Sequence, residues 1–303
     1  MSDAVSKPMP RGALRLGDWG VIRATGADAA KFLHGQLTQD IEQLPEGLAR
    51  LAGYCSAKGR LLATFVVWRA GADILLACSA DLLPTVLKRL SMFVLRAQCK
   101  LSDASAELPL FGAAGASSGS EWSVSGVVGA QVIQLPPAVI DGQPVARQLH
   151  VGAEPGGAAA LDADTWRWLE VHSGVPRIVA ATVEQFVPQM INLELVGGVN
   201  FSKGCYPGQE IVARSQYRGT LKRRAQVVQS PVALMPGQEI FHSADAGQPA
   251  GMVVLAGSHS GAHAALVEVK LVALESGTLH AASAEGPLLT TTALPYVIPA
   301  EAA

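Results

Sequence analysis

Residues 200–214 read N-F-S-K-G-C-Y-P-G-Q-E-I-V-A-R and contain one of the four cysteines of the chain. Gly204 and Gly208 allow the backbone to turn sharply and to approach a partner closely, so the loop presents Cys205 in a defined position. Lys203 lies two residues before the thiol, and a neighbouring cation favours the reactive thiolate. The pattern predicts a functional cysteine. The alternative is a structural loop in which the cysteine is a small apolar filler.

The composition is that of a compact globular protein, with 303 residues of which 49% are hydrophobic and 16% charged. The net charge of −2 argues against a general affinity for nucleic acid, which needs a basic surface. One dense basic run remains, at Lys222, Arg223 and Arg224. It indicates either a local patch for tRNA or a protein partner, or a solvated turn.

The cysteines are widely spaced, with no C-x-x-C pair and no nearby histidine, so no zinc site or iron–sulfur ligand set is recognisable. Free thiols are typical of a reducing compartment. The first residues contain no apolar signal region, and no run of about 18 apolar residues occurs. These features predict a soluble cytoplasmic protein without membrane association.

The pattern of apolar residues divides the chain into a mixed body and a β-rich tail. A capping box at Thr25 and Asp28 predicts the start of a first helix. Other predicted elements are a strand over 13–23, a hairpin within 51–79, and helices over 80–93 and 165–172. After residue 224, short apolar runs alternate with glycine and proline turns, which is typical of a small β-barrel.

These elements predict an α+β fold with a C-terminal β-barrel. We place the boundary after residue 215, with two interleaved α+β subdomains in residues 1–215 and the barrel in residues 216–303.

Residues 203–210, K-G-C-Y-P-G-Q-E, resemble the K-G-C-Y-x-G-Q-E signature of the YgfZ family, the folate-binding relatives of the glycine-cleavage T-protein. Segments 16–19, 25–28, 32–40, 57–60, 186–194 and 197–201 also resemble blocks of that family, so the likeness covers about residues 16–214. The chain is identified as a member on these motifs. The positions that match the cysteine motif are Lys203, Gly204, Cys205, Tyr206, Gly208, Gln209, Glu210 and, further on, Arg214.

The resemblance implies three domains around a central opening that holds tetrahydrofolate or a folate derivative. It places folate-binding tryptophans at Trp19 and Trp166, where a flat ring gains stacking energy on an indole. In T-protein-like sequences a glutamate holds the pterin edge, and this chain has His172 there. A neutral imidazole accepts only one hydrogen bond, so His172 is either a weaker folate contact or a capping or packing residue.

The resemblance also has a gap at the catalytic position. Where T-protein carries an aspartate pair, this chain has Ala63 and Thr64, and alanine cannot act as a general acid or base. Ordinary aminomethyl transfer is therefore disfavoured. A one-carbon enzyme remains an alternative if Asp40 or Glu194 points into the central opening.

The function implied by the resemblance is a folate-binding accessory protein in iron–sulfur cluster assembly or repair, with an indirect role in tRNA modification. Cys205 and Lys203 would be its working groups. A lone cysteine cannot hold a cluster by itself, so Cys205 is a transient ligand, a persulfide or a disulfide former. The implied partners are folate and iron–sulfur enzymes or cluster-assembly proteins. A tRNA- or protein-binding module is the second alternative.

Overall fold

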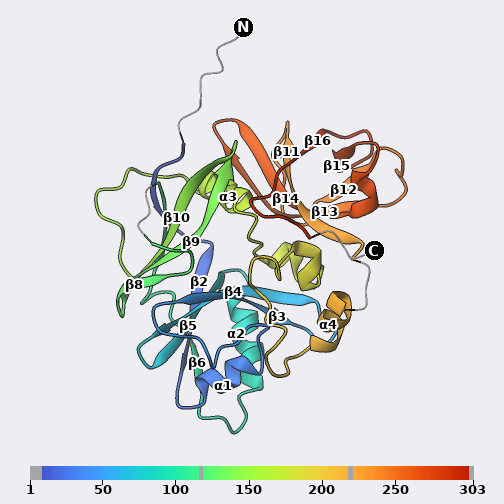
Figure 1. Cartoon of the computed structure of the whole chain (residues 1–303). Coiled ribbons are helices and arrows are strands. Elements are labelled where there is room, and N and C mark those ends of the chain that lie inside the picture. The colour runs from blue at the N-terminus through green and yellow to red at the C-terminus, as the bar shows by residue number, and fades with distance from the viewer. Residues whose placement is uncertain (1–8, 116–118, 218–220, 300–303) are drawn as a thin grey trace.

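The computed structural model describes residues 9–115, 119–217 and 221–299, which form three β-sheets (Figure 1). The first sheet is antiparallel with the order β3-β4-β5-β2-β6, and helices α1 and α2 pack against it. Its elements are β2 (Trp19–Thr25), α1 (Ala29–His34), β3 (Ala49–Cys55), β4 (Leu61–Ala70), β5 (Asp73–Ser79), α2 (Leu83–Met92) and β6 (Lys100–Asp103).

The second sheet has the order β1-β7-β10-β9-β8. Because β1 precedes β2 in the chain while β7 follows β6, the first two sheets are interleaved in sequence. Helix α3 packs against β9 on one side and against β13 and β14 on the other, so it lies between this sheet and the barrel. The elements are β1 (Gly12–Arg15), β7 (Leu110–Gly115), β8 (Val124–Val127), β9 (Ala130–Ile140), β10 (Gln143–Val151) and α3 (Ala163–His172).

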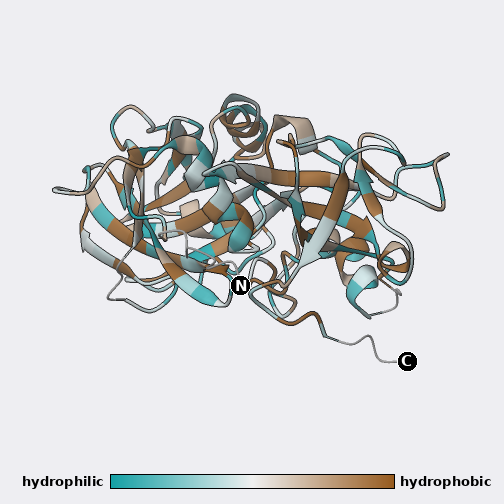
Figure 2. Ribbon diagram, turned by 90° about the horizontal axis from the view of Figure 1, so that it is seen from above, coloured by the Kyte–Doolittle hydropathy of each residue, from teal (hydrophilic) through white to brown (hydrophobic). Residues whose placement is uncertain are grey.

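The third sheet is a closed barrel with the order β11-β14-β13-β12-β15-β16. On β14, Ala265, Val267 and Val269 fill the barrel, whereas Ala264 and Leu266 join the main core. The two-residue period of a strand thus buries both faces, and apolar strands run through the interior in Figure 2. The strands are β11 (Arg223–Ser230), β12 (Glu239–His242), β13 (Gly251–His259), β14 (Ala262–Lys270), β15 (Leu279–Ala281) and β16 (Leu288–Thr292).

The segment between α3 and the barrel holds the conspicuous cysteine motif. It contains two short 3-10 helices, η1 (Ala180–Thr182) and η2 (Pro188–Ile191), followed by α4 (Gln209–Tyr217); a third, η3 (Leu271–Leu274), follows β14. No helix in the described part of the chain is long and apolar enough to cross a membrane. The barrel begins at Arg223; the division after residue 215 stays a prediction.

Two predicted element boundaries are wrong. The strand expected over 13–23 is interrupted, because β1 ends at Arg15 and β2 begins at Trp19 in a different sheet. The expected capping box is absent as well: Thr25 is the last residue of β2, and Asp28 accepts a hydrogen bond from the Gln98 N–H at 2.7 Å. The acid therefore anchors a distant loop instead of capping α1.

Candidate functional site

Two interlocked turns position the Cys205 loop. Gly208 has φ +79°, and a Cβ there would lie 2.4 Å from the Ser56 carbonyl oxygen. Gly59, with φ +70°, would place a Cβ 2.8 Å from that of Ile211. Only glycine tolerates both the backbone angle and the close approach, so the turn before α4 rests directly on the turn between β3 and β4.

Lys203 fastens the same loop to the end of α1. Its Nζ donates hydrogen bonds to the carbonyl oxygen of His34 and, at 2.8 Å, to that of Leu37, and it lies 5.0 Å from the centre of the Tyr206 ring. Burial lowers the pKa of Lys203 to about 8, against the opposing effect of Asp40 and other nearby negative charges. Lys203 is thus a buried clamp as well as a cation near the thiol.

The remaining motif residues build the scaffold around the loop. Tyr206 is buried beside Cys55, and burial raises the pKa of its hydroxyl. Gln209 is the first residue of α4. Glu210 and Arg214 pair with each other at 3.2 Å on the exposed side of this helix.

Cys205 is the one exposed thiol among the four cysteines, all of which are free. Cys55 and Cys78 are buried, and burial raises the pKa of each thiol to about 12. Cys99 is half-buried, and its pKa is also raised by burial. Reagents and partner proteins in solution therefore meet Cys205 first.

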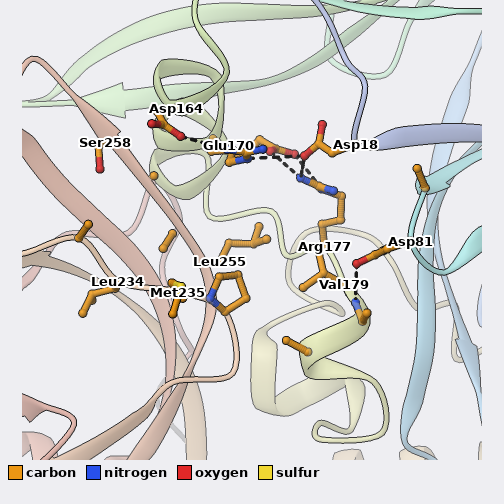
Figure 3. Close-up of a pocket in the computed structure, with 18 of the residues that line it drawn as sticks. Asp18, Asp81, Asp164, Glu170, Arg177, Val179, Leu234, Met235, Leu255 and Ser258 are labelled. Carbon is orange, nitrogen blue, oxygen red and sulfur yellow. Dashed lines mark hydrogen bonds and ion pairs between the residues drawn. The ribbon is translucent and has the colours of Figure 1, made fainter.

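A cavity of about 780 Å³ opens where the first sheet, α3 and the barrel meet (Figure 3). Arg177 crosses its wall and binds both carboxylate oxygens of Glu170, at 3.0 and 3.1 Å. The same guanidinium reaches Asp18 Oδ2 at 3.1 Å. The buried charges in this wall are thus paired.

A narrower cleft lies behind this wall and shares Glu170 and Arg177 with the open cavity. Its sides include Trp19, Trp122 and Arg147. The indole Nε1 of Trp19 is buried and has no hydrogen-bond partner among the described residues.

Arg147 is the most unusual residue of the cleft. It is 4% exposed, yet none of the ion pairs within the described residues includes it. Its guanidinium donates from Nε to the Pro136 carbonyl oxygen at 3.1 Å and lies 5.6 Å from the Trp166 ring centre. Burial lowers the pKa of Arg147 to about 10, even though the charge of Glu170 acts in the opposite direction. A buried cation without a paired carboxylate is costly and suggests a ligand site.

The three residues predicted to contact folate do not share one surface. Trp19 lines the cleft. Trp166 is 1% exposed and packs under Gly112, where a Cβ would lie 2.8 Å from the ring, so it contributes to the site through Arg147. His172 lines neither the cleft nor the open cavity; its ring packs 4.3 Å from that of Trp168.

Neither carboxylate considered for one-carbon chemistry reaches the cavities. Glu194 is buried in an ion pair with Arg224, and Asp40 bonds to His34 near the cysteine loop. Ala63 and Thr64 are buried on β4, and the Thr64 hydroxyl accepts a hydrogen bond from the Ile178 N–H. Glu170 is the only carboxylate among the described residues lining the cleft, and it is held by Arg177.

The basic run at 222–224 is not an exposed patch. Arg223 pairs with Glu268 at 2.7 Å, and Arg224 is buried against Glu194. Lys222 alone is exposed. Among residues 9–115, 119–217 and 221–299, no group of three or more histidine, cysteine or acidic side chains is arranged to hold a metal ion.

Sequence reasoning missed Arg147, Arg177 and the His34–Asp40 pair. A signal existed for Arg147, because it occupies the inward register of β10 between Val145 and Leu149. A charged residue at an alternating core position is rare unless it has a partner or a ligand.

Comparisons with known proteins add an independent line of evidence. No protein-family model matches the chain. The tRNA-modifying protein YgfZ of Serratia proteamaculans (strain 568) is 32% identical over 239 residues, which cover 73% of this chain and 71% of that protein. The tRNA-modifying protein YgfZ of Yersinia pestis (strain Pestoides F) is 30% identical over 235 residues, or 72% of this chain and 71% of its own length.

Among solved structures, the glycine cleavage system aminomethyltransferase T from Bartonella henselae is similar with a TM-score of 0.72 and 14% identity. The match covers 94% of this chain and 86% of that one. At this identity the likeness shows the fold alone: the chain has the aminomethyltransferase T fold.

Proposed function

The chain belongs to the YgfZ family of tRNA-modifying proteins, and on this basis we propose that it is a folate-binding accessory protein that supports tRNA modification through iron–sulfur enzymes. The observation that carries the proposal is the cleft containing Trp19 and the unpaired Arg147. The free cysteines fit a reducing compartment such as the cytoplasm.

The cleft fits a pteridine in chemical type. Trp19 Nε1 and the guanidinium of Arg147 are donors at one site, and a pteridine edge offers a carbonyl oxygen and ring nitrogens as acceptors. Aromatic walls at Trp19 and Trp122 suit a flat ring. The free volume of the cleft is only about 30 Å³, which is room for a water or two. The donors of the cleft would therefore meet only the edge of the pteridine, and we assign the rest of a tetrahydrofolate to the adjoining open cavity of about 780 Å³.

Tetrahydrofolate titration followed by tryptophan fluorescence tests this site. Arg147→Met is expected to weaken binding about tenfold or more, because hydrogen bonds to a charged group contribute about 1.5–3 kcal/mol. Replacing an unpaired buried cation by Met does not by itself cost stability, so misfolding is not the expected cause of the loss. Trp19→Phe, which removes the indole donor, should weaken binding in the same direction.

Arg23→Met is the matched control for that titration. Arg23 lies on the same strand as Trp19, pairs with exposed Glu107 at 2.8 Å and lines neither cavity, so its loss should leave binding unchanged. If only Arg167→Met weakened binding, the ligand would occupy the open cavity alone. Unchanged affinity in both Arg147→Met and Trp19→Phe would remove the cleft from the proposal.

The iron–sulfur part of the proposal is supported by the accessibility of Cys205. The exposed loop presents a single thiol held by a glycine-dependent turn, which suits transfer of sulfur or a transient contact with a client enzyme. One thiol cannot complete a cluster, so the client or assembly protein supplies the other ligands.

Cys205→Ser is expected to fold like the native protein yet fail to restore iron–sulfur enzyme activity and tRNA modification in a strain that lacks the protein. Serine keeps the size and lacks the sulfur chemistry. Cys99→Ser, which alters a half-buried thiol away from the loop, should restore both. Full rescue by Cys205→Ser would return this cysteine to the role of a structural filler.

A further inference from the structure

An imidazole lies against the backbone of the cysteine loop. A Cβ built on Gly204, the residue before Cys205, would lie 3.4 Å from His34 Nε2. The other ring nitrogen, Nδ1, is 3.0 Å from Asp40 Oδ1. His34 belongs to α1 and Asp40 to the segment that follows it, so the loop and this pair come from distant parts of the chain.

Asp40 is held in its ionised form, which orients the His34 ring. Burial alone would raise the pKa of Asp40, but the hydrogen bonds from the Gln43 N–H and from His34, together with the positive charge of Arg50 and of a protonated His34, keep the pKa below its ordinary value. An ionised Asp40 accepts a hydrogen bond from Nδ1–H, which fixes the tautomer and leaves the lone pair of the neutral ring on Nε2. The basic nitrogen therefore faces the loop.

We infer that Asp40, His34 and Cys205 form a proton relay for thiol–disulfide exchange, with His34 as the proton acceptor and Asp40 as its positioning residue. The inference deepens the proposed sulfur-handling role and rests on it. The co-reactant is a disulfide or persulfide on a partner. As the Cys205 sulfur forms a bond to one partner sulfur, the partner S–S bond breaks, the thiol proton moves to His34 Nε2, and the leaving thiolate takes it back.

Four charged groups surround the relay. Asp40 and, at 3.7 Å from Nδ1, Glu42 favour the imidazolium that forms when the proton arrives. Arg50 donates to the Asp40 carbonyl oxygen from β3, and the Lys203 ammonium is bound to the His34 carbonyl. Lys203 interacts electrostatically with Cys205, and the two acids lie beside Nδ1, so a thiolate and an imidazolium would each face a charge of opposite sign.

The test is the rate of exchange between the whole protein and an aromatic disulfide reagent that releases a coloured thiolate, measured from pH 5 to pH 10. At pH 7, His34→Gln is expected to react about a hundredfold more slowly than the native protein, the lower end of the effect of a general base. Near pH 10 the two rates should converge, because hydroxide can then remove the thiol proton in place of His34. Asp40→Asn should show a smaller loss with the same convergence.

His280→Gln is the control, because His280 lies on the barrel with both ring nitrogens hydrogen-bonded, to Thr278 and Gly286. Cys205→Ser supplies the background from the other thiols. The inference would be overturned if the exchange rates of the native protein and of both relay variants followed the same pH profile. It would also be overturned if the lower rate of the variants persisted at pH 10, because that would indicate a structural role. Exchange needs no folate, so the two proposals can fail separately. If the native protein bound no tetrahydrofolate while His34→Gln still lost exchange rate at pH 7, the folate proposal would be contradicted and the relay would stand.

Discussion

Arg177→Met is expected to lower the free energy of unfolding by about 3–5 kcal/mol, the cost of breaking a buried ion pair by removing one partner. Arg177 holds Glu170 with two hydrogen bonds and reaches Asp18 and the Ser79 hydroxyl, both at 3.1 Å. Glu170 is 5% exposed and would be left as an unpaired buried carboxylate. Because Ser79 ends β5, Asp18 precedes β2 and Glu170 lies in α3, the loss should weaken the contact between the first sheet and α3.

Chemical denaturation followed by circular dichroism measures this effect. The double variant Arg177→Met, Glu170→Leu should recover most of the stability, since replacing both partners by apolar groups is often neutral. Arg23→Met, which breaks the exposed pair with Glu107, should cost at most about 1 kcal/mol. A loss below 1 kcal/mol in Arg177→Met would mean that the network is as solvated as a surface pair.

The family, the α+β fold and the barrel were all predictable from the sequence, and they are confirmed. The motif around Cys205 is informative because its turn brings backbone segments into close contact, and such contacts require glycine. The barrel was recognisable because its strands are short, apolar and separated by turn residues. Both signals are local, so the sequence displays them directly.

The predictions that were wrong concern residues whose roles depend on contacts with distant parts of the chain. Asp28 looks like a helix cap, but the chain at Gln98 offers it a better donor. The run at 222–224 looks like a basic patch, although Glu268 and Glu194 neutralise two of its three charges. Likewise, the partners of Trp166 and the isolation of Arg147 follow from how the second sheet meets α3, which no local pattern encodes.

The environment of His172 predicts a loss of stability in mild acid. The ring is 8% exposed, and its Nε2 has no partner among the described residues. Burial lowers the pKa of His172 from 6.5 to about 4, although Asp141 and the Val139 carbonyl act in the opposite direction. Between these two values the unfolded chain binds the proton and the folded protein does not, so stability falls as the pH falls from about 6.5 to about 4. The loss amounts to about 3 kcal/mol.

The difference between the native protein and His172→Gln isolates this effect. Native Asp40 and Asp162 have lowered pKa values, whereas those of Glu194 and Glu268 are raised; these contributions are common to both proteins and cancel. The free energy of unfolding of the native protein, measured relative to that of His172→Gln, should therefore fall by about 3 kcal/mol between pH 7 and pH 4. Denaturation curves at a series of pH values measure it. If the two stability profiles ran parallel, His172 would be protonated equally in the folded and unfolded states, and its contact with Trp168 would not exclude the charge.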